Sequence, residues 1–161
     1  MAKDQKSGET ADERLNRELE QLLQELRVAM PGVQVLFAFL LAVPFQQRFA
    51  QVTDFQQDVY FATLLASAVA SALFIAPTAY HRMMFRGRDK PRLVEISSRF
   101  ALAGLAALAI AMTGAILLAT DFIFDGPIVV ITFVLTVAMF AGLWFGLGIV
   151  RRMSDERSRD A

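Results

Sequence analysis

Four long stretches of this chain contain no Asp, Glu, Lys, Arg or His, and they limit its possible folds more than any other feature. They cover residues 28–45, 59–80, 100–120 and 127–150. A helix rises about 1.5 Å per residue, so stretches of roughly 18 to 24 residues match the hydrocarbon core of a bilayer, which is about 30 Å thick. The sequence therefore predicts an all-α, polytopic membrane protein with four transmembrane helices.

The composition excludes several other classes of protein. Hydrophobic residues make up 55% of the 161 residues, and the chain has no cysteine and one histidine. Without cysteine there is no disulfide, thiol nucleophile or thiolate metal site, and one histidine cannot form the usual zinc spacings. An intramembrane enzyme would need a nucleophile and a base, or a metal, together in one cavity. We therefore expect no enzymatic activity, no cofactor and no metal centre.

The N-terminal region changes character at Thr10. Residues 1–9 are polar and aperiodic, which predicts a disordered tail. Residues 10–30 predict an amphipathic cytoplasmic helix that begins at a capping box formed by Thr10 and Glu13. Its apolar stripe, in alternating steps of four and three, contains Leu15, Leu19, Leu22 and Leu26. The stripe suits a helix on the membrane surface or against its own bundle, or a short coiled coil that sets an oligomer.

The first span is interrupted by polar and helix-breaking residues. Pro31 and Gly32 predict a bend between the amphipathic helix and this span, because proline removes a helical hydrogen bond. Gln34 is the candidate polar residue inside the span. At Pro44 a neighbouring group or interfacial water must replace the lost hydrogen bond. A polar connection then leads to Asp54, which we expect to cap the second helix.

Lysine and arginine are distributed unevenly along the chain. Five lie in residues 1–30, six in residues 81–99 and four in the C-terminal tail 151–161, whereas Arg48 is alone in the remaining connections. Cationic residues near the ends of spans stay on the cytoplasmic side of the membrane. Both termini and the central loop are therefore predicted to be cytoplasmic. The first apolar run follows an acidic helix and lacks a short basic leader, so it does not fit a cleavable signal peptide.

Two motifs border the first two spans. The first is Arg27-Val28-Ala29-Met30-Pro31-Gly32-Val33-Gln34-Val35-Leu36-Phe37, continued by Val43-Pro44-Phe45-Gln46. The second is Ile75-Ala76-Pro77-Thr78-Ala79-Tyr80-His81-Arg82, followed by Phe85-Arg86. In these motifs the chain resembles a family of small bacterial four-span membrane proteins of unknown function. The resemblance covers about residues 14–152 and implies a bacterial cytoplasmic (inner) membrane and a compact helical fold, without catalytic residues.

The loop between the second and third spans is the candidate surface for anionic lipid or a membrane protein partner. Its aromatic and methionine side chains suit the headgroup region, where its cations can meet lipid phosphates. The candidate residues are His81, Arg82, Arg86, Arg88, Lys90 and Arg92. Membrane topology alone also requires such charges, so we expect no nucleic-acid partner. His81 could sense pH, but a hydrogen-bonded interfacial histidine explains it more simply.

Small residues recur at four-residue spacing in the spans, which allows helices to pack closely in lipid. The packing candidates include Ala107, Ala111, Gly142 and Gly146. They suit packing within a four-helix bundle, or contact between protomers, most readily at the glycine pair. A homo-oligomer is therefore expected.

A six-residue pattern, T-D-F-x-x-D, occurs in both predicted outer connections, at residues 53–58 and 120–125. If the helices brought the two copies together, their carboxylates could bind a hard divalent cation. The carboxylates are those of Asp54, Asp58, Asp121 and Asp125. Helix capping and interfacial turns explain these residues more simply, so they are only weak metal candidates.

Two functions remain open at this stage. The first is a structural or interaction protein that self-associates and contacts anionic lipid or a membrane partner. The second is an oligomeric channel or transporter for a small solute or ion, with a lumen at Gln34 and the serine and threonine face of the second span. The second has less support, because ion-coupled transporters usually hold ionisable groups near the bilayer midplane and hydroxyl side chains usually bond to their own helix.

Overall fold

The computed structural model describes residues 11–84 and 90–146 of the chain. Within these ranges the structure has four α-helices: α1 (Ala11–Ala42), α2 (Asp54–Met84), α3 (Lys90–Ile123) and α4 (Pro127–Phe140). Two 3₁₀ turns, Val43–Phe45 and Gln47–Gln51, connect α1 to α2, and a π-helical turn, Ala141–Gly146, continues α4. Four helical segments are long and apolar enough to cross a membrane, which agrees with the predicted all-α, four-span class.

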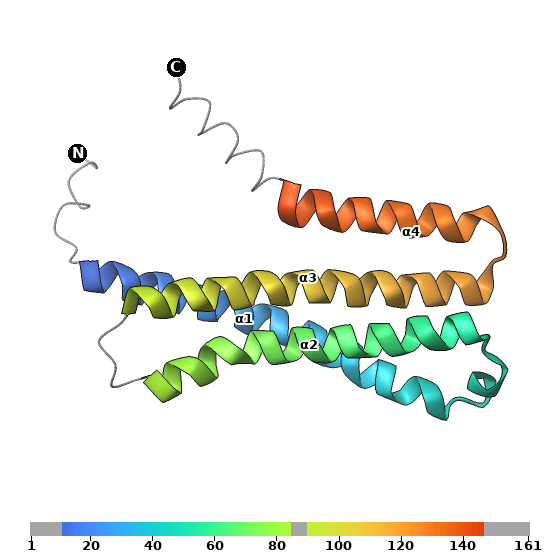
Figure 1. The fold of residues 1–161 in the computed structure, drawn as a ribbon, viewed down its shortest axis with the longest axis horizontal. Coiled ribbons are helices and arrows are strands. Elements are labelled where there is room, and N and C mark those ends of the chain that lie inside the picture. The colour runs from blue at the N-terminus through green and yellow to red at the C-terminus, as the bar shows by residue number, and fades with distance from the viewer. Residues whose placement is uncertain (1–10, 85–89, 147–161) are drawn as a thin grey trace, which may run out of the picture.

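The helices lie side by side and their connections gather at two ends of the molecule (Figure 1). α1 begins, α2 ends and α3 begins at one end, which we call the basic end. The α1–α2 connection, residues 43–53, and the α3–α4 connection, residues 124–126, lie together at the other, which we call the connection end. The predicted spans 59–80 and 100–120 lie within α2 and α3. The predicted tails, and the fourth span beyond Gly146, fall outside the described residues.

α1 corrects the prediction of a separate amphipathic helix followed by a bend. One helix from Ala11 to Ala42 contains both the amphipathic segment and the first span, with Pro31 inside it. Its buried residues are seven positions apart: Leu19, Leu26, Val33 and Leu40. Steps of seven keep successive side chains on one face, so the buried seam continues past Pro31. Packing along this seam offsets the cost of an internal proline, about 3 kcal/mol.

The leucine stripe of α1 packs inside its own chain. Leu26 belongs to the buried core with Val33 of α1 and Phe74 of α2, and Leu22 packs against this core. Leu19 is buried, and Leu15 is partly buried. The amphipathic segment therefore packs against the other helices of its own chain, which was one of the predicted alternatives.

α2 and α3 form the most closely packed helix pair, along a seam that includes two glycines. A Cβ added at Gly104 would lie 2.5 Å from Cε1 of Phe74, whose side chain is fully buried. A Cβ added at Gly114 would overlap Oγ1 of Thr63. Both glycines therefore allow α2 side chains to approach the α3 backbone. The packing candidates Ala107 and Ala111 are also buried in the chain interior.

α4 packs directly only against α3 among the described helices (Figure 1). Its buried residues are Val129, Thr136 and Phe140, and most of its other side chains are exposed. The four helices therefore do not close into the four-helix bundle that the sequence predicted. A hollow remains beside α4, over α3 and facing α2.

Candidate functional site

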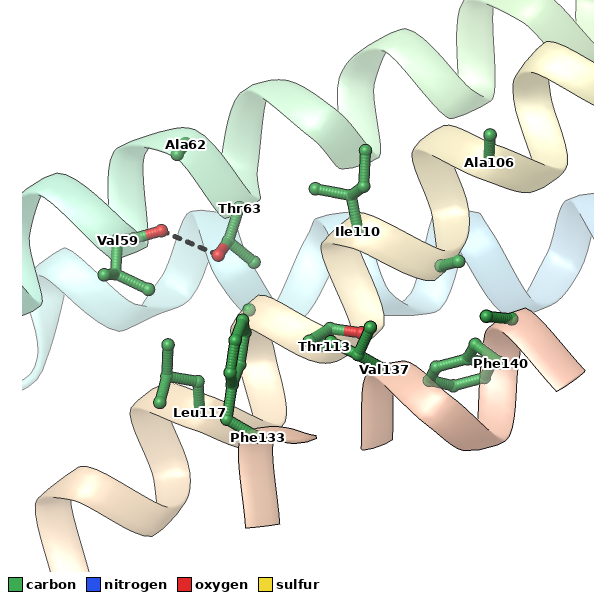
Figure 2. Close-up of a pocket in the computed structure, with 13 residues that line it drawn as sticks. Val59, Ala62, Thr63, Ala106, Ile110, Thr113, Leu117, Phe133, Val137 and Phe140 are labelled. Atoms are coloured by element: carbon green, nitrogen blue, oxygen red, sulfur yellow. Dashed lines mark hydrogen bonds between the residues drawn. The ribbon is translucent and has the colours of Figure 1, made fainter. Parts of the chain in front are cut away.

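The hollow beside α4, which we call the α2–α4 groove, has a floor of small residues (Figure 2). Its central part has a volume of about 480 Å³, and a further hollow of about 520 Å³ continues it toward the connection end. The small lining residues on α2 and α3 are Ala62, Thr63, Ala106, Ala109, Thr113 and Gly114. Phe133, Val137 and Phe140 of α4 line it from the other side (Figure 2). Such a lining suits hydrocarbon or an apolar helix better than a polar solute.

Several hydroxyl groups in the spans are hydrogen-bonded to their own helix backbone. Thr63 Oγ1, for example, donates to the carbonyl of Val59 at 2.6 Å. The same kind of bond is made by Ser67, Ser71, Thr120 and Thr136. This confirms the predicted preference, and it leaves the hydroxyl protons of the α2 face engaged rather than free for a solute.

A capping box orders the start of α2 at the connection end. The N–H of Thr53 donates to Oε1 of Gln56 at 3.1 Å, and the N–H of Gln56 donates to Oγ1 of Thr53 at 3.2 Å. Thr53 therefore caps α2 in place of the predicted Asp54. Asp54 is the first residue of the helix, where a carboxylate still interacts favourably with the helix dipole.

The four aspartates of the repeated T-D-F-x-x-D pattern do not gather into a cation site. Among the described residues, no three His, Asp or Glu side chains are placed to hold a metal ion. Instead Nε2 of Gln56 donates to Oδ2 of Asp121 at 2.8 Å, which joins α2 to α3. The two copies of the pattern differ structurally, since residues 53–58 begin α2 whereas residues 120–125 contain the end of α3.

Tyr60 supplies the hydrogen bond that Pro44 removes. In a continuing α-helix, the carbonyl of Leu40 would accept from the N–H of residue 44, which proline lacks. The buried hydroxyl of Tyr60 donates to this carbonyl at 3.0 Å. A neighbouring side chain thus provides the replacement that the sequence required. Phe49 packs edge-on against Tyr60, with the ring centroids 5.3 Å apart.

A second hollow, which we call the connection-end pocket, lies between α1, α3 and residues 43–53. Its volume of about 970 Å³ is at the upper end of the range for ligand pockets, about 300–1,000 Å³. The polar lining residues are Gln46, Gln47, Arg48, Gln56 and Tyr60. Cζ of Arg48 lies 4.9 Å from the ring centroid of Phe122. No sequence pattern predicted this pocket, because Arg48 stands out in the sequence only as a charge on the predicted outer side.

The structure describes two of the six predicted lipid-binding side chains. Four side chains fall outside the described set: those of His81, Arg86, Arg88 and Lys90. The other two are exposed at the basic end, with Arg82 near the end of α2 and Arg92 near the start of α3.

Gln34 and Gly142, two further candidate residues, are exposed and do not take part in packing within the chain. Gln34 is exposed on α1. Gly142 is exposed in the π-helical turn, and a Cβ added there would have no other atom within 4 Å. Gly146 ends the same turn. The π-helical turn that contains both glycines therefore leaves room for a neighbouring helix at Gly142.

The four apolar helices and the apolar α2–α4 groove define a multi-pass helical membrane protein. The chain belongs to DUF6328, a family of unknown function whose model matches residues 8–148. Comparison with curated proteins and with solved structures gives no match. The family covers most of the chain, in agreement with the predicted resemblance, and it brings no assigned activity.

Proposed function

We propose that this chain is a structural and interaction protein of the bacterial cytoplasmic membrane, not an enzyme, that forms a homo-oligomer and binds anionic lipid at its basic end. The observation that carries the proposal is the position of α4, which packs only on α3 among the described helices and leaves the α2–α4 groove open. Exposed apolar side chains alone do not require a partner, because lipid solvates them. A groove must also be filled, by a lipid chain or by a helix, because its walls otherwise lose dispersion contacts.

An apolar helix of a second copy suits the α2–α4 groove. The small residues of its floor, such as Ala106 and Ala109, allow a helix to approach closely, which is how helices associate in lipid. The open position at Gly142, beyond the end of α4, supports a close helix contact of the same kind. Two copies that use the same patch form a closed dimer.

The charge distribution supports lipid binding at the basic end. Arg82 and Arg92 are exposed there, and every Lys and Arg of the chain except Arg48 lies before the first span, between the second and third, or after the fourth. Positive residues of this kind stay in the cytoplasm, which assigns both termini and the basic end to that side. Each one near an anionic membrane surface contributes about 1 kcal/mol of attraction.

Native mass spectrometry of the full chain in nanodiscs tests both parts of the proposal. Ala109 lines the groove, whereas Ala103 is exposed on the same helix outside that lining. We expect an oligomer for the wild type and for Ala103→Trp, and a monomer for Ala109→Trp, because the added ring fills the groove. A monomeric wild type, or an oligomeric Ala109→Trp variant, refutes self-association.

The same spectra report lipid retention. We expect the double variant R82Q/R92Q to retain less phosphatidylglycerol than the wild type, and R82K/R92K, which keeps the charge, to retain as much. Equal retention in the wild type and the glutamine variant refutes lipid binding through these two arginines.

A further inference from the structure

The shape of the connection-end pocket follows from the side chains of α3. Ala115 and Ala119 line the pocket four residues apart, so they share a face of the helix, and their small side chains leave space between α3 and α1. Leu118, Phe122 and Ile123 form the rest of the α3 wall. From Ala115 to Phe122 this wall extends about 10 Å along the helix. The pocket is therefore deep enough to admit part of an alkyl chain.

The interior of the pocket is apolar and fixed by contacts within the chain. Leu36 and Leu40 line it from α1. The Tyr60 hydroxyl, one of the polar groups of the lining, already donates to the Leu40 carbonyl, and Phe49 packs against the Tyr60 ring. Side chains held in this way need not be ordered again on binding, which favours affinity.

The mouth of the pocket is polar and carries one positive charge. Gln46, Gln47 and Arg48 follow the apolar run of α1 directly, at the level where headgroups meet hydrocarbon. Cζ of Arg48 lies over the Phe122 ring, and this ring supplies no carboxylate or carbonyl acceptor, so the N–H donors of the guanidinium can still bind an anionic group. In the described part of the chain, no carboxylate forms an ion pair with Arg48.

The acidic residues of the connection end lie outside the lining of this pocket. None of the four aspartates of the T-D-F-x-x-D copies lines it, so Arg48 is the one charged residue of its described lining. Asp121, the aspartate next to the lining residue Phe122, already accepts the Gln56 amide through Oδ2.

From this combination we infer that the connection-end pocket binds one molecule that has a long alkyl chain and an anionic head group, with the chain between α1 and α3 and the head group on Arg48. The site lies at the opposite end of the helices from Arg82 and Arg92. It is thus separate from the lipid binding proposed for the basic end, and either one can fail without the other.

The test measures binding of four probes to the delipidated full-length chain in detergent micelles, by native mass spectrometry. The probes are phosphatidylglycerol, phosphatidylcholine, oleate and inorganic phosphate. We expect one phosphatidylglycerol or one oleate per chain, bound about tenfold more tightly than phosphatidylcholine, because their head groups keep a net negative charge for the arginine, whereas the choline ammonium of phosphatidylcholine neutralises its phosphate. Tighter binding of phosphatidylglycerol identifies a bilayer lipid as the ligand, and tighter binding of oleate identifies a free fatty acid.

Three variants assign the binding to the pocket. Arg48→Gln should lose the preference for the anionic probes, about tenfold, while phosphatidylcholine binding stays unchanged. Ala115→Trp fills the interior and should lower the binding of every probe that has an alkyl chain. Ala103→Trp, with the same change at an exposed position of α3 outside the pocket lining, should bind like the wild type.

Four results would overturn the inference. The first is that Arg48→Gln and Ala115→Trp both bind the probes with wild-type affinity, and the second is that Ala103→Trp loses as much affinity as Ala115→Trp. The third is that the wild type binds phosphatidylcholine as tightly as phosphatidylglycerol. The fourth is that it binds inorganic phosphate as tightly as the anionic amphiphiles. The double variant R82Q/R92Q serves as the control for the basic end. It should leave this one-to-one binding unchanged even where it lowers the total retained lipid.

Discussion

α3 contacts α2 on one side and α4 on the other, and the two contacts are built differently. Against α2, the glycines at positions 104 and 114 bring Phe74 and Thr63 onto the α3 backbone. Against α4, the contact leaves the α2–α4 groove beside it, and Phe133 stays 39% exposed. In lipid, helices associate mainly through close packing rather than through hydrophobicity. The comparison indicates that the α2–α3 pair holds the fold together, whereas the α4 side leaves a surface for contact with another molecule.

The largest expected difference between the two contacts comes from removing an aromatic ring from each. Phe74→Ala leaves a cavity in a fully buried site, and we expect it to lower the free energy of unfolding by about 3–5 kcal/mol. Phe133→Ala removes the same ring from a partly exposed groove wall, where lipid can replace the lost contacts, so its effect should be much smaller. Unfolding of the purified chain by SDS titration in mixed micelles measures both. Equal losses would show that α4 is as tightly packed as α2.

A smaller difference is expected from adding a methyl group to each glycine contact. Gly114→Ala places a Cβ against the Thr63 side chain, and we expect overpacking to cost about 1–3 kcal/mol. Gly142→Ala has open space and should cost no stability. The same SDS titration compares the two variants. A loss of stability in Gly142→Ala would show that this glycine also packs within its own chain.

The smallest of these effects concerns the hydrogen bond between Tyr60 and the Leu40 carbonyl. Tyr60→Phe leaves the carbonyl without its partner, at a cost of about 1 kcal/mol. Adding Pro44→Ala restores a backbone N–H that can donate to the same carbonyl, so the penalty of Tyr60→Phe should shrink in that background. A double-mutant cycle of unfolding free energies measures the coupling. An unchanged penalty would show that Tyr60 does not replace the proline bond.

The sequence predicted the helical class and the four apolar segments because charge-free length is a local property. The predicted bend between a separate amphipathic helix and the first span was wrong, for a physical reason. Proline and glycine are local signals for a bend, but Val33 and Leu40 continue the seven-residue spacing of Leu19 and Leu26, and packing along that seam keeps the helix intact. The spacing is visible in the sequence once the stripe is followed past Pro31.

The two hollows were less predictable than the helices. The α2–α4 groove depends on α4 packing against α3 alone, and small residues in a sequence do not say which neighbour they face. The connection-end pocket depends on the separation of α1 from α3 and on the position of Arg48 over Phe122. Both are tertiary features, whereas the Thr53–Gln56 capping box that replaced Asp54 was readable from the sequence as a four-residue motif.

The unbroken course of α1 gives the molecule a mechanical property. Its charged part, from Ala11 to Arg27, is about 25 Å long and precedes the first apolar run. Leu19 and Leu26 of this part are buried on the same face as Val33 and Leu40, so the packing that holds the apolar part of α1 also holds its charged part. A shift of the apolar part of α1 should therefore carry the charged part with it.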